Sequence, residues 1–368
     1  MKKEVHLLFA LLRNALFRQP FVEDEWKNVD WNELYQIIKS HTLQTLVAES
    51  AIMLPPQSQP DAKVQSELLQ LLALNMSEHS RLDADIAKVF GLLTDKGFHP
   101  ILMKGQGNAS FYPNPLFRKC GDADIFVGEK DYNAVCQYLV SEVEGTKASK
   151  ENDKHQVVFF GKTELEIHRF AEIASLPQNN DAYQRMVERY FSSPDFVVLA
   201  GSSIPIPPHQ FLPVYVFHHL WHHMKHHGVG LRQFCDVALI LHRLAGKLDL
   251  NQLKEDLLSL NIMSEWQLAG NLIVDYLGLP REEFPFYKKA ARFRVNAMLK
   301  LVIEDGNFST NRHYRYKTKY LIIKKARSFF IHLPRLWCMS KMHPWWGACT
   351  FGSIFSHAIK DLAASHDK

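Results

Sequence analysis

Strand-like patterns are confined to the middle of this chain of 368 residues, and helical patterns lie on both sides. Polar and apolar residues alternate at 122–127, and 156–160 and 163–169 resemble two paired strands with a Gly-Lys turn between them. By contrast, apolar residues recur about every 3.6 positions at 61–95 and again after residue 210. We therefore expect an α+β fold. We divide the chain into an N-terminal helical region (1–95), a mixed core (96–208), a C-terminal helical bundle (209–305) and a tail (306–368).

Composition is typical of a globular protein, with 46% hydrophobic and 22% charged residues. The five cysteines form no CxxC pair, which argues against a disulfide framework or a cysteine-rich zinc site. No apolar run reaches the roughly 18 residues that cross a bilayer. The N-terminal segment predicts an amphipathic helix and not a signal peptide. We expect a cytoplasmic protein.

The tail is basic and rich in aromatic residues. Residues 306–360 contain ten Lys and Arg and no acid, which leaves 33 basic and 39 acidic residues, a net of −6, elsewhere. Three alternatives remain open: a nucleic acid or other polyanion partner, a peripheral contact with the inner membrane face, or helices that pack on the acidic body.

Two aspartates provide the most informative motif. Asp122 and Asp124 are two positions apart in a predicted strand, so both side chains lie on one face, about 6–7 Å apart. Carboxylates this close repel each other unless a cation lies between them. Oxygen ligands of this kind suit Mg²⁺ (or Mn²⁺). The pair therefore predicts a divalent metal site.

A third acid would complete a two-metal site, and Glu166 in the later strand 163–169 is the best candidate. Alternation places Glu164 and His168 on the same face of that strand. Two metals can activate an attacking hydroxyl and stabilise a leaving pyrophosphate.

Phosphate-binding groups precede the aspartates. The Gly105-Gln106-Gly107 turn would bring backbone N–H groups close to phosphate. Lys104 and Arg118 carry the charge to neutralise phosphate. With His168, we take Lys104, Gly105, Gln106 and Arg118 as candidate nucleotide-binding residues.

Six histidines form two stripes on a predicted helix over 211–227, namely 218/222/226 and 219/223/227. A helix with site-facing histidines, a purely structural helix and a dedicated metal site are the alternatives. We choose His222, His226, Arg232 and Asp236 as candidates for the acceptor side of the cleft. A histidine there could take a proton from the acceptor.

These residues carry a resemblance. The pattern Lys104-Gly105, Tyr112-Pro113, Arg118, Gly121-Asp122-x-Asp124-Ile125-x-Val127 and Glu166-Ile167-His168 resembles the uncharacterised bacterial nucleotidyltransferase family of the DNA polymerase beta-like superfamily. The later segment, His222, His226, Arg232 and Asp236-Val237-Ala238, is similar to the helical region of that family.

The resemblance implies a polymerase beta-like mixed sheet flanked by helical regions, with Asp122, Asp124 and Glu166 as the metal-binding catalytic acids. It also implies magnesium-dependent transfer of a nucleoside monophosphate from a nucleoside triphosphate to an unknown acceptor. In this scheme, both aspartates bind both ions and Glu166 binds the catalytic one. The alternatives are a non-catalytic nucleotide-binding or membrane-edge scaffold module of the same fold, and a histidine-rich metal carrier.

Overall fold

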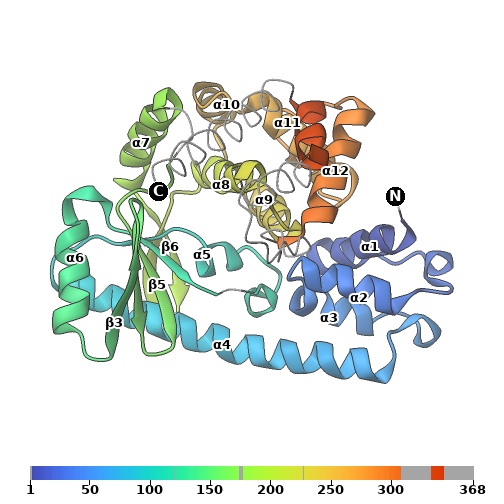
Figure 1. Cartoon of the computed structure of the whole chain (residues 1–368), viewed down its shortest axis with the longest axis horizontal. Coiled ribbons are helices and arrows are strands. Elements are labelled where there is room, and N and C mark those ends of the chain that lie inside the picture. The colour runs from blue at the N-terminus through green and yellow to red at the C-terminus, as the bar shows by residue number, and fades with distance from the viewer. Residues whose placement is uncertain (1, 120, 174–176, 227, 308–332, 344–368) are drawn as a thin grey trace, which may run out of the picture.

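The computed structural model describes residues 2–119, 121–173, 177–226, 228–307 and 333–343. It has a five-stranded mixed sheet beside α4, with helical regions before and after it in sequence (Figure 1). The expected α+β fold is confirmed. Its N-terminal helices are α1 (Lys3–Phe17), α2 (Trp31–Ser40), α3 (Gln44–Ile52) and α4 (Ala62–Asp95).

Helix α4 forms the long base of the molecule in Figure 1 and joins the N-terminal helices to the sheet. The side chain of Asp61 caps its first turn by accepting a hydrogen bond from Val64 N at 2.8 Å. Gly97 follows its last turn with φ +86°, a conformation that glycine adopts without strain. Buried residues recur along one face from Val64 to Leu93. Because the apolar residues repeat so regularly, the helix expected over 61–95 agrees closely with the observed one.

The central sheet has the order β1-β2-β5-β4-β3, in which β2 and β5 are parallel and the other neighbours are antiparallel. A separate hairpin pairs β6 with β7. The strands are β1 (Ile101–Leu102), β2 (Ala123–Phe126), β3 (Thr146–Glu151), β4 (His155–Phe160), β5 (Thr163–His168), β6 (Asp195–Leu199) and β7 (Ser202–Ile206). The helices within this region are α5 (Gln106–Ala109), α6 (Gly128–Glu142) and α7 (Pro177–Phe191).

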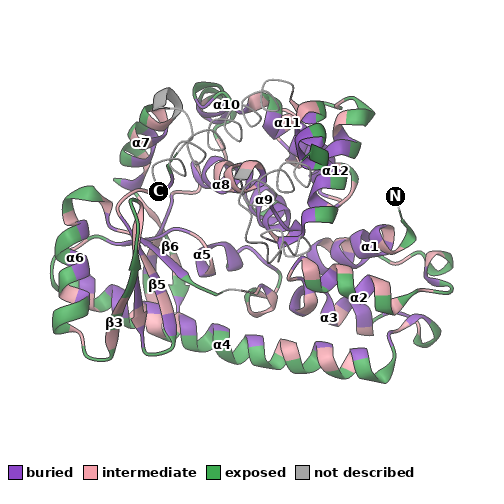
Figure 2. Ribbon diagram, in the orientation of Figure 1, coloured by how far each residue is buried: buried purple, intermediate pink, exposed green. Residues whose placement is uncertain are grey.

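The C-terminal helices pack on the side of the molecule away from α4 (Figure 1). Of these, α9 is almost entirely buried (Figure 2). They are α8 (Leu212–His226), α9 (Leu231–Leu244), α10 (Leu250–Ser259), α11 (Met263–Asp275) and α12 (Arg292–Asp305).

Two hydrophobic cores stabilise the structure. One lies between the sheet, α6, the β6-β7 hairpin and the C-terminal half of α4. The other is shared by α1–α3 and α8–α12, so the two helical regions pack on each other although they are far apart in sequence. The pocket described below is lined by residues of the sheet and of α8 and α9.

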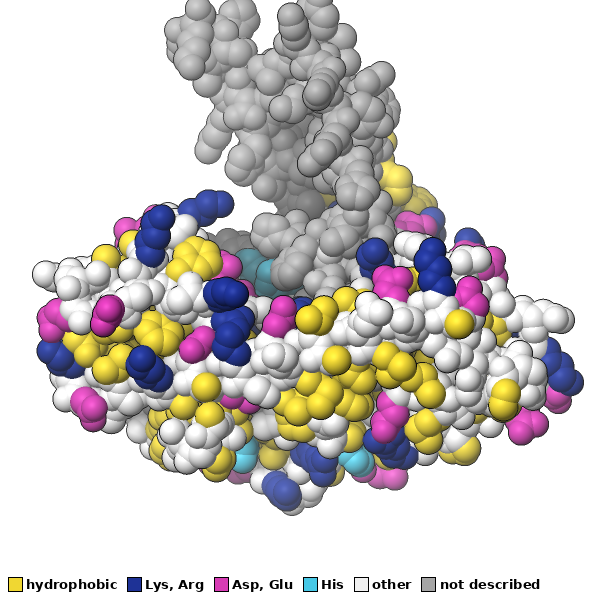
Figure 3. Space-filling view, turned by 90° about the horizontal axis from the view of Figure 1, so that it is seen from below, with side chains coloured by type: hydrophobic (Ala, Val, Ile, Leu, Met, Phe, Trp, Pro, Cys, Tyr) yellow, Lys and Arg dark blue, Asp and Glu magenta, His cyan; other side chains and the backbone are white. Residues whose placement is uncertain are grey.

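The surface crossed by α4 carries apolar side chains near its middle, as Figure 3 shows from below. Leu69, Leu74 and Met76 are the exposed large apolar residues of this helix. None of the helices in the described ranges is both long and apolar enough to span a lipid bilayer.

Most of the basic tail lies outside the described residues, but 333–342 form a helix that packs on the body. Cys338, Met339 and Met342 are buried in the helical core. The Arg335 guanidinium forms an ion pair with Asp305 and donates to Met224 O. In this stretch the tail packs on the body, which agrees with the third of the three alternatives, helices that pack on the acidic body.

Candidate active site

The three predicted acids come from two neighbouring parallel strands. Asp124 of β2 is the register partner of Glu166 of β5, and Asp122 lies just before β2. His168, two residues after Glu166 on the same face, is fully buried. Its Nε2 lies 3.1 Å from Asp124 Oδ1 and 3.2 Å from Glu166 Oε2. Strand pairing therefore brings together Asp122, Asp124, Glu166 and His168.

The charges of these acids are strongly coupled. The negative charge of Asp124, then burial and the charge of Glu166, raise the pKa of Asp122 to about 6. Burial disfavours the Asp124 carboxylate, but Lys104 and His168 outweigh it and hold its pKa well below the usual value. Burial likewise opposes the Glu166 carboxylate, yet the hydrogen bond with His168 lowers its pKa. The three carboxylates thus act on one another, and Lys104 and His168 partly compensate their negative charge.

The Lys104-Gly105 turn lies against these acids. Lys104 Nζ is 2.8 Å from Asp124 Oδ1. Gly105 has φ +57°, and a Cβ there would lie 3.3 Å from Asp122 O, so the turn favours glycine for both reasons. The Gln106 side chain is buried and is not among the residues that line the pocket described below.

Arg118 and Asp236 form a buried ion pair. Arg118 Nε and Nη2 each donate to one Asp236 oxygen at 2.8 Å. Tyr112 Oη also donates to Asp236, at 2.7 Å, and Asn108 Nδ2 at 3.4 Å. Asp236 therefore holds Arg118 in place, in the two-pronged geometry that arginine and carboxylates favour.

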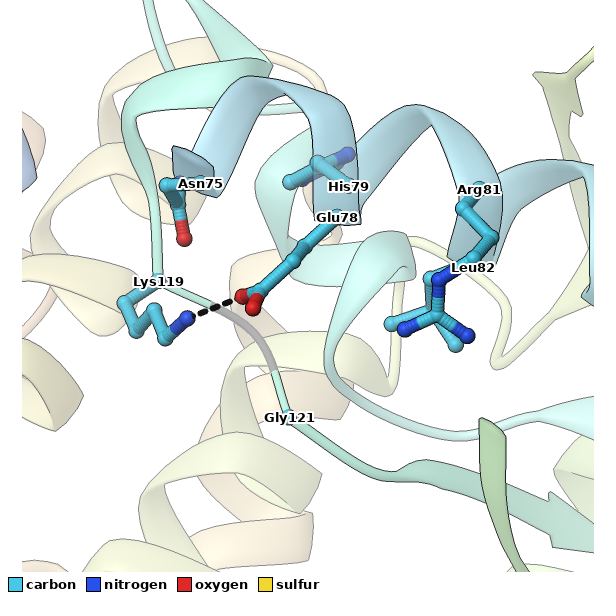
Figure 4. A pocket seen from close by; sticks show the side chains of 7 residues that line it. All are labelled: Asn75, Glu78, His79, Arg81, Leu82, Lys119 and Gly121. Atoms are coloured by element: carbon cyan, nitrogen blue, oxygen red, sulfur yellow. Dashed lines mark hydrogen bonds and ion pairs between the residues drawn. The ribbon is translucent and has the colours of Figure 1, made fainter. Parts of the chain in front are cut away.

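Helix α4 anchors the loop that carries Arg118 (Figure 4). Asn75 Nδ2 donates to Leu116 O at 2.7 Å, and Glu78 forms an ion pair with Lys119 at 2.5 Å. Figure 4 shows both side chains pointing toward this loop. The long helix thus positions one wall of the site.

One pocket of about 280 Å³ includes most of the predicted residues. Its acidic residues are Asp122, Asp124, Glu166 and Asp236. Its basic residues are Lys104, Arg118, Lys119, Lys154 and Arg232. Gly105 also lines it.

The α8 histidines that line the pocket are His219 and His223. His222 is not among the lining residues, and the His226 side chain lies outside the described part of the chain. Among the described histidine side chains of α8, those of the 219/223 stripe therefore line the pocket.

A cluster of His155, Glu166 and His168 has ligand atoms within 4.8 Å of one another. Asn152 fixes the ring of His155: its Oδ1 accepts from the backbone N–H groups of Lys154 and His155, so its Nδ2 donates to His155 Nε2 at 3.2 Å. Neutral His155 then carries its proton on Nδ1, which lies 3.5 Å from Glu166 Oε2. This contact is too long for a strong hydrogen bond, so the Nδ1–H of His155 lies beside Glu166 without a hydrogen-bond partner among the described residues.

The family model of an uncharacterised nucleotidyltransferase matches residues 27–278, which is more than half of the chain. The chain belongs to this nucleotidyltransferase family. The match includes the sheet, the pocket, and helices α8 and α9.

Among solved structures, this chain is similar to an antigenic nucleotidyltransferase-like protein from Paracoccidioides brasiliensis. The identity is 14% and the TM-score 0.37, over 53% of this chain and 92% of that one. No curated protein matches the chain.

The sequence patterns did not single out Glu172, Lys154 or His155. Glu172 is 3% exposed, and its two oxygens lie 2.8 Å from Lys154 Nζ and from His219 Nδ1. Glu172 follows β5 in an irregular segment, and no spacing rule connects it to helix α8. Lys154 and His155 lie at the turn that begins β4.

Proposed function

We propose that this protein transfers a nucleoside monophosphate from a nucleoside triphosphate to an acceptor hydroxyl. The observation that supports it best is the pairing of Asp124 with Glu166 across parallel strands, with Asp122 beside them and its pKa raised by their charge. Such a cluster of carboxylates favours a bound cation.

The donor set fits a hard divalent ion. Asp122, Asp124 and Glu166 supply carboxylate oxygens in one pocket, and these suit Mg²⁺ or Mn²⁺. When bound, such an ion would polarise a phosphate oxygen and stabilise the leaving pyrophosphate. The ammonium of Lys104, which contacts the Asp124 carboxylate, would then move from this carboxylate to a phosphate oxygen.

The basic residues of the pocket would bind the triphosphate. Lys104, Arg118 and Lys154 come from three different segments and line one cavity with the acids. Because Nε and Nη2 of Arg118 both donate to Asp236, the position of the guanidinium is fixed. The acceptor oxygen attacks the α-phosphorus and forms an O–P bond. The bond from this phosphorus to the bridging oxygen breaks, and pyrophosphate leaves with the electron pair.

The test is pyrophosphate release from each labelled nucleoside triphosphate with Mg²⁺ or Mn²⁺, together with labelling of the protein itself. Asp124→Asn and Glu166→Gln should each lower the rate about 10³-fold, because several kcal/mol of transition-state stabilisation depend on these ligands. Glu164→Gln is the matched control: it lies on the same face of β5 but does not line the pocket.

Titration with Mn²⁺ gives a readout that needs no acceptor. The wild-type protein and Glu164→Gln should bind Mn²⁺, and the two active-site variants should bind it more weakly. Equal affinity in all four proteins would contradict the proposed site. Binding of nucleotide and Mn²⁺ without turnover would favour the alternative of a non-catalytic nucleotide-binding module.

A further inference from the structure

Glu172 and His219 form a partly buried pair next to the pocket of the three acids, and neither is among the candidate residues chosen from the sequence. Glu172 Oε2 lies 2.8 Å from His219 Nδ1, while its Oε1 receives Lys154 Nζ at 2.8 Å and the backbone N–H of Ile173 at 3.2 Å. Both His219 and Lys154 line the pocket that contains Asp122, Asp124 and Glu166. We propose that His219, oriented by Glu172, takes the proton from the acceptor hydroxyl.

The partners of Glu172 determine which nitrogen of His219 carries the proton. Burial raises the cost of the Glu172 charge, but His219 and Lys154 outweigh it and hold the pKa of Glu172 well below its usual value. An ionised carboxylate can only accept, so the short contact requires a proton on His219 Nδ1. The neutral ring then presents the Nε2 lone pair, the form in which histidine acts as a base.

The ring is neutral at pH 7. Burial first, and then the positive charge of Lys104, lower the pKa of His219 to about 4. Lys104 also contacts Asp124, so its charge acts on both the acids and His219. A bound triphosphate brings negative charge into the pocket and so strengthens His219 as a base.

This proton transfer is part of the nucleotidyl transfer and rests on the proposed function. The acceptor oxygen forms a bond to the α-phosphorus as its proton moves to His219 Nε2, and pyrophosphate leaves with the electrons of the broken P–O bond. Glu172 stays ionised and stabilises the imidazolium. Glu172 is thus a positioning residue and His219 a catalytic one.

The first test is the variant His219→Asn. The amide Nδ2 of asparagine can still donate to Glu172, but asparagine has no basic nitrogen to take a proton. We expect kcat for pyrophosphate release to fall about 10²–10⁴-fold, with the nucleotide affinity unchanged. Imidazole in solution should restore part of the activity of His219→Ala, which a structural role would not allow. The control is His242→Asn, from a His Nδ1–Glu283 pair at 2.6 Å that lies outside the pocket.

Nitrogen NMR of the wild-type histidines provides a readout without turnover. His219 should carry its proton on Nδ1, and Glu172→Gln should weaken this preference and lower kcat without changing nucleotide affinity. A ring protonated on Nε2 overturns the inference, whatever the activity. Full activity in His219→Asn also overturns the inference. If Asp124→Asn nevertheless loses activity in the same assay, the proposed function still holds and only the role of His219 is wrong. Absence of transfer in the wild-type protein overturns the proposed function and the role of His219 with it.

Discussion

Asp124 illustrates how a buried charge is maintained at this site. The residue is 5% exposed, and its Oδ1 contacts both Lys104 Nζ and His168 Nε2. A buried carboxylate without such partners would take up a proton, because burial disfavours the charged form. The same two partners therefore keep Asp124 ionised.

Gly105 offers a test of the turn at this site. Gly105→Ala should cost about 1–3 kcal/mol of stability because of its positive φ, and its Cβ would press on Asp122 O at 3.3 Å. Gly97→Ala also has a positive φ but meets nothing within 4 Å. Denaturant unfolding should show a loss in both variants, whereas Mn²⁺ affinity should fall only in Gly105→Ala. Equal Mn²⁺ affinities would disprove the link between this turn and Asp122.

Single residues also show how far the sequence predicts the site. Alternation within a strand groups Asp122 with Asp124 and Glu166 with His168. The link between the two groups came from the need for a third acid and from the family resemblance, because β2 and β5 pair across a long stretch of sequence. The choice between the two histidine stripes could not be made in this way. Helix α8 is buried on several sides, as Val214, Phe217 and Trp221 show, so its pattern does not indicate which face meets the pocket.

At the scale of elements, strong apolar patterns predicted well and polar elements did not. Helix α4 and the β4-β5 hairpin match their predicted bounds closely. Strand β3 was not predicted because it lies at the sheet edge, and four of its six residues are exposed. Helix α7 was also not predicted.

His41 connects two helices and makes stability depend on pH. It follows α2, is fully buried, and its Nδ1 accepts from Leu231 N, the first residue of α9, at 3.2 Å. Burial lowers the pKa of His41 to about 4. The unfolded chain, with a pKa near 6.5, then binds the proton more readily, so stability present above pH 6.5 is lost as the pH falls toward 4.

His41→Asn keeps an acceptor for Leu231 N but has no ring to protonate. Between pH 7 and pH 5, the free energy of unfolding of the wild-type protein should therefore fall by about 2 kcal/mol more than that of the variant. Denaturant titrations at both pH values measure this difference. The same fall in both proteins would show that His41 does not contribute to the pH dependence.

At the scale of the whole molecule, the sheet depends on helices from both sides in sequence. The loop carrying Arg118 is held by Asn75 from α4, and the Arg118 side chain by Asp236 from α9. The helical regions in turn share one hydrophobic core. The pocket is therefore a product of the whole arrangement.

Excision of the mixed core tests this dependence. A fragment of residues 96–208 lacks Asn75, His219 and Asp236 and exposes the apolar side chains that face α4. We expect it to lack a cooperative thermal transition by circular dichroism, unlike the full chain. A fragment that melts cooperatively and binds Mn²⁺ as the full chain does would contradict this expectation.

The Arg118–Asp236 pair also limits how such a chain can be recombined. The two residues are 118 positions apart, and each is buried against the other. A chimera joined anywhere between them inherits one partner from each parent. If the second parent does not match, a charge is stranded without its counterion, which costs far more than a surface mismatch. Grafts between relatives should therefore carry both residues together.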